Sequence, residues 1–146
     1  MICFLIFVSN NKAVCQNLKI EKQIDSIFQA TIKSAENLEY DKLSETVDDS
    51  HYAGFIVGNV YYSRYDSLIN DLKAKSSGII SQHIAIEKEK ITVLSDNIVL
   101  LTACGTSTAD VNNGNSFSLR FNWSFVYERF DGKWKVVQSH QSSSRL

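Results

Sequence analysis

The chain has 146 residues, 44% of them hydrophobic, which suits a single domain with a buried core. The formal net charge at pH 7 is −1 and the basic residues are dispersed. This excludes general nucleic-acid binding, which needs a basic excess, and a polybasic attachment to membranes. The absence of proline is typical of a compact domain with tight glycine and asparagine turns.

Residues 1–15 have features of an export signal. An apolar run over residues 2–8 is too short to span a bilayer, and Ala13-Val14-Cys15 has the small-x-small pattern of a cleavage site. The basic leader that normally precedes such a run is missing. We predict an export signal, with a periplasmic or secreted protein, or else an N-terminal tail on a cytoplasmic one. Removal of the signal would leave Cys104 as the single cysteine, so no intrachain disulfide is expected.

The first half of the chain has helical periodicity. Apolar residues recur at helical spacing over residues 18–38 and predict an amphipathic helix. They are Ile20, Ile24, Ile27, Phe28, Thr31, Ala35 and Leu38. A short second helix is predicted near residues 40–47, a strand over 51–57 and a turn at Gly58-Asn59. Ser63 is the predicted N-cap of a third helix, with Asp66 completing a capping box, and Gly78 is predicted to end that helix at positive φ.

From Ile79 onward the apolar period is two. Ile84 and Ile86 share one face of a strand, whereas Ile91 and Val93 fall on the other, so we predict a β-bulge near residues 87–90. Turns at 96–97, 112–114 and Asp131-Gly132 then connect four long antiparallel strands. These features predict an α+β fold over residues 18–142, in which a curved antiparallel sheet wraps around the N-terminal helices as an open cone. Such openings are common ligand sites.

Two segments carry a family resemblance. Residues 79–99, and residues 125–142 with their Gly-x-Trp turn and His-x-Ser ending, resemble the SnoaL-like branch of the nuclear-transport-factor-two-like superfamily. The chain is also similar to the association domain of calmodulin-dependent kinases, which assembles through the same fold. The resemblance implies a conical α+β domain that is often dimeric through its open sheet, so a homodimer is expected. It does not imply one activity, because members include cyclases, isomerases, dehydratases and assembly domains.

His140 and His83 are the candidate catalytic residues, because imidazole titrates near neutral pH and can carry a proton at the mouth of a cone. Strand alternation predicts that His140 shares a face with Trp134, Val136, Gln138 and Ser142. The alternative is a hydrogen-bonded histidine that ties strand ends together. Asp48 and Asp49 form a paired carboxylate before a strand, either as poised acids or as solvated turn residues.

The candidate ligand-binding residues are Tyr52, Tyr62, Arg120, Trp123 and His140. Arg120 could grip a carboxylate or phosphate, or could belong to a polar stripe on a dimer face. The aromatic residues could line an entrance or simply be packed in the core.

Neither a metal site nor a cofactor is expected, because the three histidines are scattered and no glycine-rich phosphate loop is present. Three functions remain open at this point. The protein could bind a small, largely apolar molecule in the cone, act as an acid-base enzyme of the isomerase, dehydratase or cyclase kind, or serve as a dimerisation and assembly module without catalysis.

Overall fold

The computed structural model describes residues 5–51 and 53–146, with side chains from residue 14 onward. Helices precede a sheet of long strands, which confirms the predicted α+β fold class. The elements in chain order are α1 (Leu5–Glu36), α2 (Tyr40–Ser44), β1 (Phe55–Val57), β2 (Val60–Tyr62), α3 (Tyr65–Lys75), β3 (Ile79–Ser95), β4 (Ile98–Val111), β5 (Ser116–Phe130) and β6 (Lys133–Arg145).

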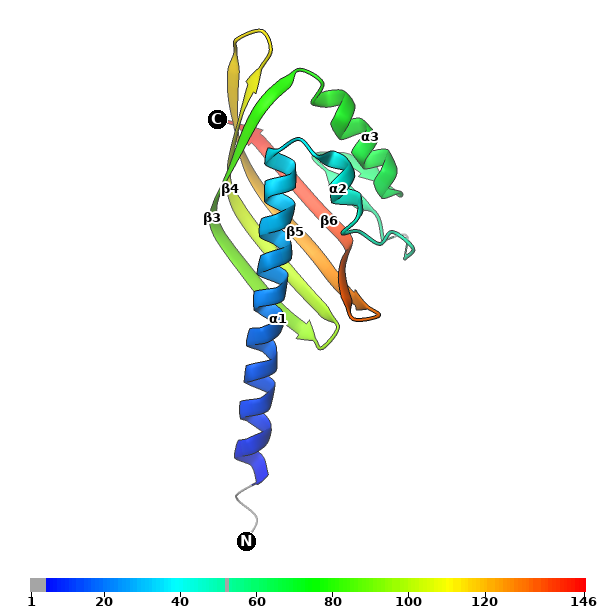
Figure 1. Cartoon of the computed structure of the whole chain (residues 1–146), viewed down its shortest axis with the longest axis vertical. Coiled ribbons are helices and arrows are strands. Elements are labelled where there is room, and N and C mark those ends of the chain that lie inside the picture. The colour runs from blue at the N-terminus through cyan, green and yellow to red at the C-terminus, as the bar shows by residue number, and fades with distance from the viewer. Residues whose placement is uncertain (1–4, 52) are drawn as a thin grey trace.

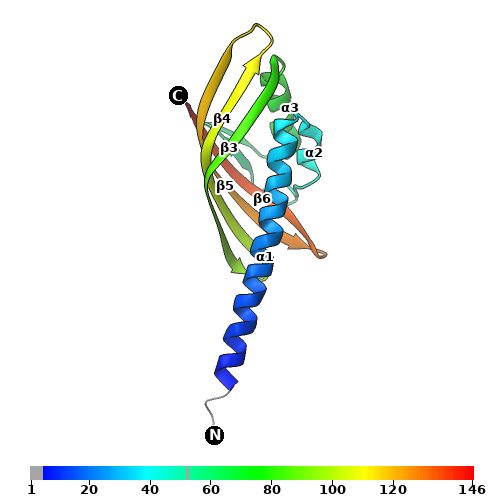
Figure 2. The ribbon, with the colours of Figure 1, turned by 60° about the vertical axis from the view of Figure 1, so that its left-hand side comes forward.

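The six strands form one curved, unclosed sheet in the order β2-β1-β6-β5-β4-β3. All neighbours are antiparallel except β1 and β6, which are parallel. Helix α1 runs along one side of this sheet, and α2 and α3 lie at the same end as the C-terminus (Figures 1 and 2). The N-terminal end of α1 projects past the sheet (Figure 1).

Helix α1 supplies one side of the core. Its buried residues are Ile20, Ile24, Phe28 and Ile32. Of the other residues of the predicted stripe, Ile27 and Ala35 are half-buried against the core, Thr31 is half-buried, and Leu38 lies beyond the end of the helix. The Phe28 ring lies 5.8 Å from that of Phe125 on β5.

The helix begins earlier than predicted, at Leu5, and so runs through most of the predicted export segment, whose first four residues lie outside the described ones. Within the described part of the chain, no helix is long and apolar enough to cross a membrane.

The predicted bulge in β3 is confirmed. The register between β3 and β4 shifts between Ile86 and Lys88, so Glu87 is the extra residue. Beyond it, Ile91 and Val93 lie opposite the buried Leu101 and Val99. The bulge therefore keeps both apolar halves of the strand on the core side.

A second bulge, in β6, corrects one prediction. Val126 pairs with Gln138 and Tyr127 pairs with Val136, which leaves Val137 as an extra residue. One extra residue reverses the alternation. Trp134 and Val136 therefore pack in the core, Ser139 is buried in the next segment, and His140 is exposed on the opposite face. The prediction that His140 shares a face with Trp134 is wrong for this reason.

The connections differ from prediction in detail. The N-cap of α3 is Arg64 rather than Ser63, and the Arg64 side chain makes no capping hydrogen bond to the helix. Helix α3 ends at Lys75, and Gly78 does not have the predicted positive φ. The Asp131-Gly132 turn is confirmed, with φ values of 46° and 80° at its two residues.

Candidate functional site

A cavity of about 280 Å³ lies between the helices and the concave side of the sheet. Residues from α1, α2, α3 and five strands line it, so it forms only when the whole domain is folded. The lining residues are Ala35, Tyr40, Leu43, Val57, Leu72, Ser76, Gln82, Ile84, Ser107, Leu119, Phe121, Trp123, Gln141, Ser142 and Ser143.

The described lining carries no carboxylate, histidine, lysine or arginine, and its only titratable side chain is the phenol of Tyr40. Phe121 and Trp123 form an aromatic wall, with stacked rings whose centroids are 3.8 Å apart. Two amides are partly engaged: Gln82 Nε2 donates to the Ala35 carbonyl, and Gln141 Nε2 donates to Ser139 Oγ at 3.4 Å. The cavity therefore offers apolar surface together with neutral hydroxyl and amide groups.

All three histidines lie away from this cavity. His83 Nδ1 is 2.8 Å from Glu36 Oε1, and the same oxygen accepts a bond from the Ile84 amide, so the carboxylate joins α1 to β3. His51 stacks on Phe130 with ring centroids 5.4 Å apart. His140 lies beside Ser124 on the outer face of the sheet.

The predicted ligand-binding residues are dispersed. Trp123 lines the cavity. Arg120 makes a two-pronged ion pair with the bulge residue Glu87 on the outer side of the sheet, with N–O distances of 2.8 and 3.2 Å. The Tyr62 hydroxyl donates to Asp71, and this bond raises the pKa of the phenol. Tyr52 lies outside the described residues.

A wider hollow of about 840 Å³ opens on the outer face of the sheet, where strands β3 to β6 run side by side. Its two glutamates and two lysines are consecutive residues of β3, and His140 lies on β6 at the opposite side of the hollow. Its lining residues are Glu87, Lys88, Glu89, Lys90, Thr102, Ala103, Cys104, Asn122, Trp123, Ser124, His140 and Ser142.

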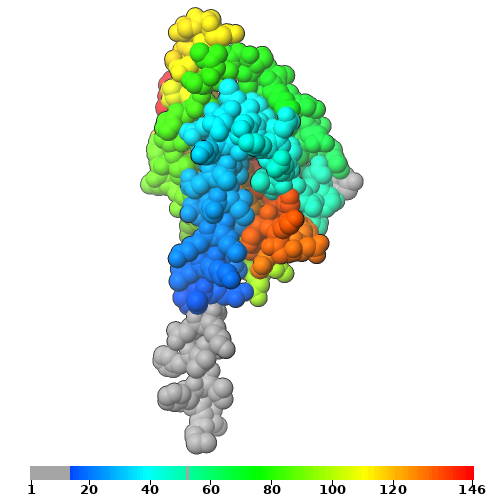
Figure 3. Space-filling model, viewed as in Figure 1, coloured from blue at the N-terminus to red at the C-terminus, as the bar shows by residue number. Residues whose placement is uncertain are grey.

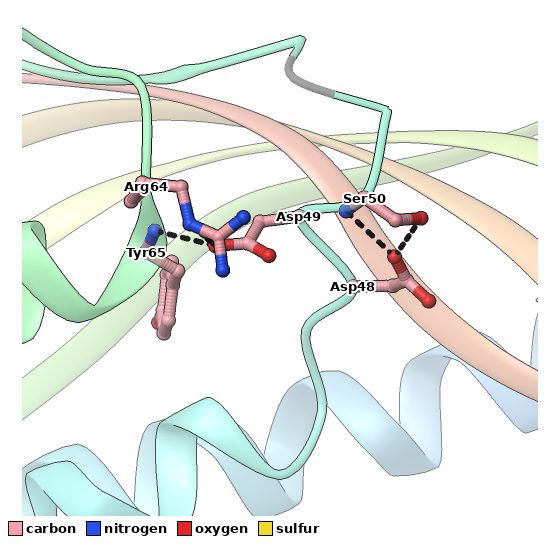
Figure 4. Close-up of polar contacts among 5 residues, drawn as sticks. All are labelled: Asp48, Asp49, Ser50, Arg64 and Tyr65. Atoms are coloured by element: carbon pink, nitrogen blue, oxygen red, sulfur yellow. Dashed lines mark hydrogen bonds and ion pairs between the residues drawn. The ribbon is translucent and has the colours of Figure 1, made fainter.

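The paired carboxylates Asp48 and Asp49 stabilise the loop before β1 (Figure 4). Asp48 Oδ1 accepts bonds from the amide and hydroxyl of Ser50, and these bonds lower the pKa of Asp48. Asp49 Oδ2 lies 3.1 Å from both the Tyr65 amide and Arg64 Nε, so it caps α3. The two side chains therefore act as turn and capping groups.

Sequence reasoning missed the polar lining of the cavity, namely Ser76, Gln82, Ser107 and Gln141. Gln82 could have been found, because it alternates with Ile84 on the apolar face of its strand. Gln141 faces inward because of the bulge at Val137, which the sequence pattern does not show. Within the described residues, no group of three or more acidic, histidine or cysteine side chains is placed to hold a metal.

Several solved structures share this fold. A candidate scytalone dehydratase from Novosphingobium aromaticivorans has a TM-score of 0.78 at 10% identity, covering 91% of this chain and 88% of that one. A candidate calcium/calmodulin dependent protein kinase II association domain from Xanthomonas campestris has a TM-score of 0.67 at 17% identity, covering 84% and 86%. A nuclear transport factor 2-like protein from Salmonella enterica has a TM-score of 0.77 at 14% identity, covering 86% and 92%. At these identities the likeness shows the fold alone.

Comparison of sequences gives the family. No curated protein sequence gives a significant match. Residues 20–145 match the family described as the calcium/calmodulin dependent protein kinase II association domain, and this match spans most of the chain. The chain therefore belongs to the calcium/calmodulin dependent protein kinase II association domain family and has the nuclear transport factor 2-like fold.

Proposed function

We propose that the protein binds a small, uncharged, largely apolar molecule in the cavity inside the cone. The observation that carries this proposal is the cavity of about 280 Å³ whose described lining has apolar and neutral polar groups but no charge. At about 30 Å³ per molecule it has room for about nine waters, and a ligand of comparable bulk would fill it. A charged ligand would lose its hydration there without gaining a counter-ion.

The same geometry favours binding over acid-base catalysis. General acid-base chemistry needs a titratable group within hydrogen-bond reach of the reacting atom. The histidines lie at the α1–β3 contact, beside Phe130 and on the outer sheet face. Among the described lining residues of the cavity, only Tyr40 is titratable and none is charged. Four solved structures of the same fold are named as dehydratases or dehydrochlorinases, so an enzyme of that kind remains the alternative function.

Native mass spectrometry of the purified full chain tests the proposal. We expect a bound species of low mass on the wild-type protein that is lost on unfolding. Leu119→Trp should fill the cavity and remove that species, while Thr108→Trp, on the outer side of the neighbouring strand, should retain it. Retention by the filled variant, or loss from both variants alike, would count against a ligand in the cone.

A second candidate function is assembly through the outer face of the sheet. The family match to an association domain and the open hollow over β3 to β6 both favour it. Thr102 is exposed within that hollow, so Thr102→Arg places a bulky charge there without disturbing the core. Sedimentation velocity should show a dimer for the wild type and a monomer for the variant, and a wild-type monomer at micromolar concentration would reject the assembly role.

Export remains part of the proposal and rests on the pattern in residues 1–15. Expression of the full chain in a bacterial host, followed by fractionation, tests it. We expect a shortened protein in the periplasm or medium, and a full-length protein confined to the cytoplasm would contradict export.

A further inference from the structure

A groove separate from the cavity runs between residues 15–27 of α1 and the turn that joins β5 to β6. These two segments lie side by side on the face shown in Figure 3. The groove has a volume of about 840 Å³. It is lined by Cys15, Leu18, Lys19, Lys22, Gln23, Ser26, Ile27, Gly132, Lys133 and Trp134.

The floor of this groove is apolar and firmly held. Trp134 is 7% exposed, and its indole Nε1 donates to Gln23 Oε1 at 3.2 Å, which fixes the ring against α1. Ile27 packs against the core cluster. Leu18, by contrast, is 53% exposed, so the outer part of the floor meets solvent. Cys15 and Leu18 therefore place exposed apolar surface beside a fixed aromatic ring, where an apolar side chain of a partner would pack.

The rim of the groove is basic. Lys19, Lys22 and Lys133 line it and are exposed, and none of the lining residues is acidic. Asp25 of α1 does not line the groove and instead accepts a bond from Gln29, which also donates to Glu89 of β3. The three lysines give this groove a positive charge, whereas the whole chain has a net charge of −1.

We propose that this groove binds an acidic amphipathic segment of a partner protein. An apolar face of such a segment would cover Leu18 beside the edge of the Trp134 ring, and its carboxylates would meet the three lysines, in the manner of a helix laid into a groove. From Leu18 to Ile27 helix α1 rises about 14 Å, which accommodates a partner helix of about two and a half turns. A recessed groove suits a peptide better than a bilayer, because a flat surface would rest on the rims.

A binding measurement with a synthetic probe tests this proposal on the full chain. The probe is a labelled helical peptide of about 12 residues, with leucine on one face and glutamate elsewhere, and its counterpart has lysine in place of glutamate. Fluorescence anisotropy should show binding of the acidic peptide alone, and the affinity should fall as salt is added, because exposed charges are screened.

Matched variants locate the binding site. The double variant Lys22→Glu/Lys133→Glu should weaken binding about tenfold or more, since it converts attraction at the rim into repulsion. Lys88→Glu/Lys90→Glu makes the same change in net charge on the outer sheet face and should leave the affinity unchanged. Leu18→Ser should weaken binding without altering the salt dependence. Circular dichroism and urea unfolding of each variant verify that the fold is retained.

Three results would overturn the proposal. One is equal binding of the acidic and basic peptides, and another is an equal loss in both double variants. The third is a peptide that does not bind while vesicles of anionic lipid bind through Lys22 and Lys133, or while those substitutions dissociate a dimer. That third result would assign the groove to a membrane or to a second copy of the chain.

Discussion

The carboxylate of Asp49 caps α3 from a loop that lies 16 residues earlier in the chain. It bonds the Tyr65 amide and pairs with Arg64, whereas the residues just before the helix supply no capping side chain. One side chain therefore couples the loop before β1 to the helix that covers the cavity. An uncapped amide at this half-buried helix start would lose a partner that water replaces incompletely.

Asp49→Ala should lower the free energy of unfolding by about 1 kcal/mol, the usual scale for loss of a helix cap. Asp49→Asn keeps an acceptor and should lose less. The matched control is Asp48→Ala, whose two lost bonds join neighbouring residues in an exposed loop. Urea unfolding of the three variants measures this. Equal losses at positions 48 and 49 would contradict a specific capping role.

Glu89 is a second residue whose side chain affects stability, and its effect depends on pH. Its carboxylate lies under α1, and burial, together with the charge of Asp25, raises its pKa above the ordinary value of 4.5. A group whose pKa is higher in the folded protein binds its proton more tightly there. The protonated Glu89 side chain therefore contributes to the free energy of unfolding fully below the pKa that it has in the unfolded chain. This contribution is lost as the pH rises through its pKa in the folded protein.

Glu89→Gln should accordingly stabilise the protein at pH 7, by up to about 1 kcal/mol because solvent screens this partly exposed site. The gain should shrink as the pH falls toward 4, where the wild-type carboxyl is protonated. Gln29 can still donate to the new amide oxygen. Urea unfolding at pH 7 and pH 4 gives the comparison, and Glu21→Gln on α1 is the control. A gain in stability that grows as the pH falls would contradict the raised pKa of Glu89.

At the scale of elements, two of the register shifts in the sheet determine which residues face the cavity. The bulge at Glu87 turns the second half of β3 inward, and the bulge at Val137 turns Ser139 and Gln141 inward while it moves His140 outward. Next to the first bulge, Gly105 lies against the backbone of β3. A side-chain carbon there would overlap the Ala85 carbonyl oxygen and would come within 2.9 Å of the Phe121 ring.

Gly105→Ala should therefore cost about 1–3 kcal/mol, the range for overpacking, since a backbone carbonyl cannot move aside as a flexible side chain can. Gly78→Ala is the control, because its new carbon would come no closer than 3.3 Å to the Val111 side chain. Chemical denaturation should show a clear loss at position 105 and a smaller one at position 78. The reverse order would mean that the close approach at the bulge relaxes easily.

These elements also show what the sequence could predict. The apolar stripe of α1 was predictable from its helical spacing. The bulge at Glu87 was predictable because the apolar residues of β3 change from even to odd positions there. The bulge at Val137 was not, because Trp134, Val136, Gln138 and His140 alternate without a break, and the apolar Val137 fits either face. The early start of α1 was hidden as well, since Val14 and Leu18 are exposed and follow no buried stripe. The neutral lining of the cavity depends on which residues of eight elements meet, and pattern alone does not provide that.

At the scale of the whole molecule, the three surfaces have different chemistry. The cavity inside the cone is neutral, the outer hollow is mixed in charge, and the groove beside α1 is basic. They are lined by largely different residues, so substitutions can separate their roles. Leu119→Trp should then remove only ligand binding, and Thr102→Arg only assembly. Lys22→Glu/Lys133→Glu should remove only the binding of the acidic segment.

The most direct test of the neutral cavity is a calorimetric titration of the full chain with indole and with its charged relative indole-3-acetate. We expect indole to bind the wild type, indole-3-acetate to bind at least about tenfold more weakly because its carboxylate finds no counter-charge, and Leu119→Trp to bind neither. Equal binding of the two compounds, or unchanged indole binding in the filled variant, would contradict the account.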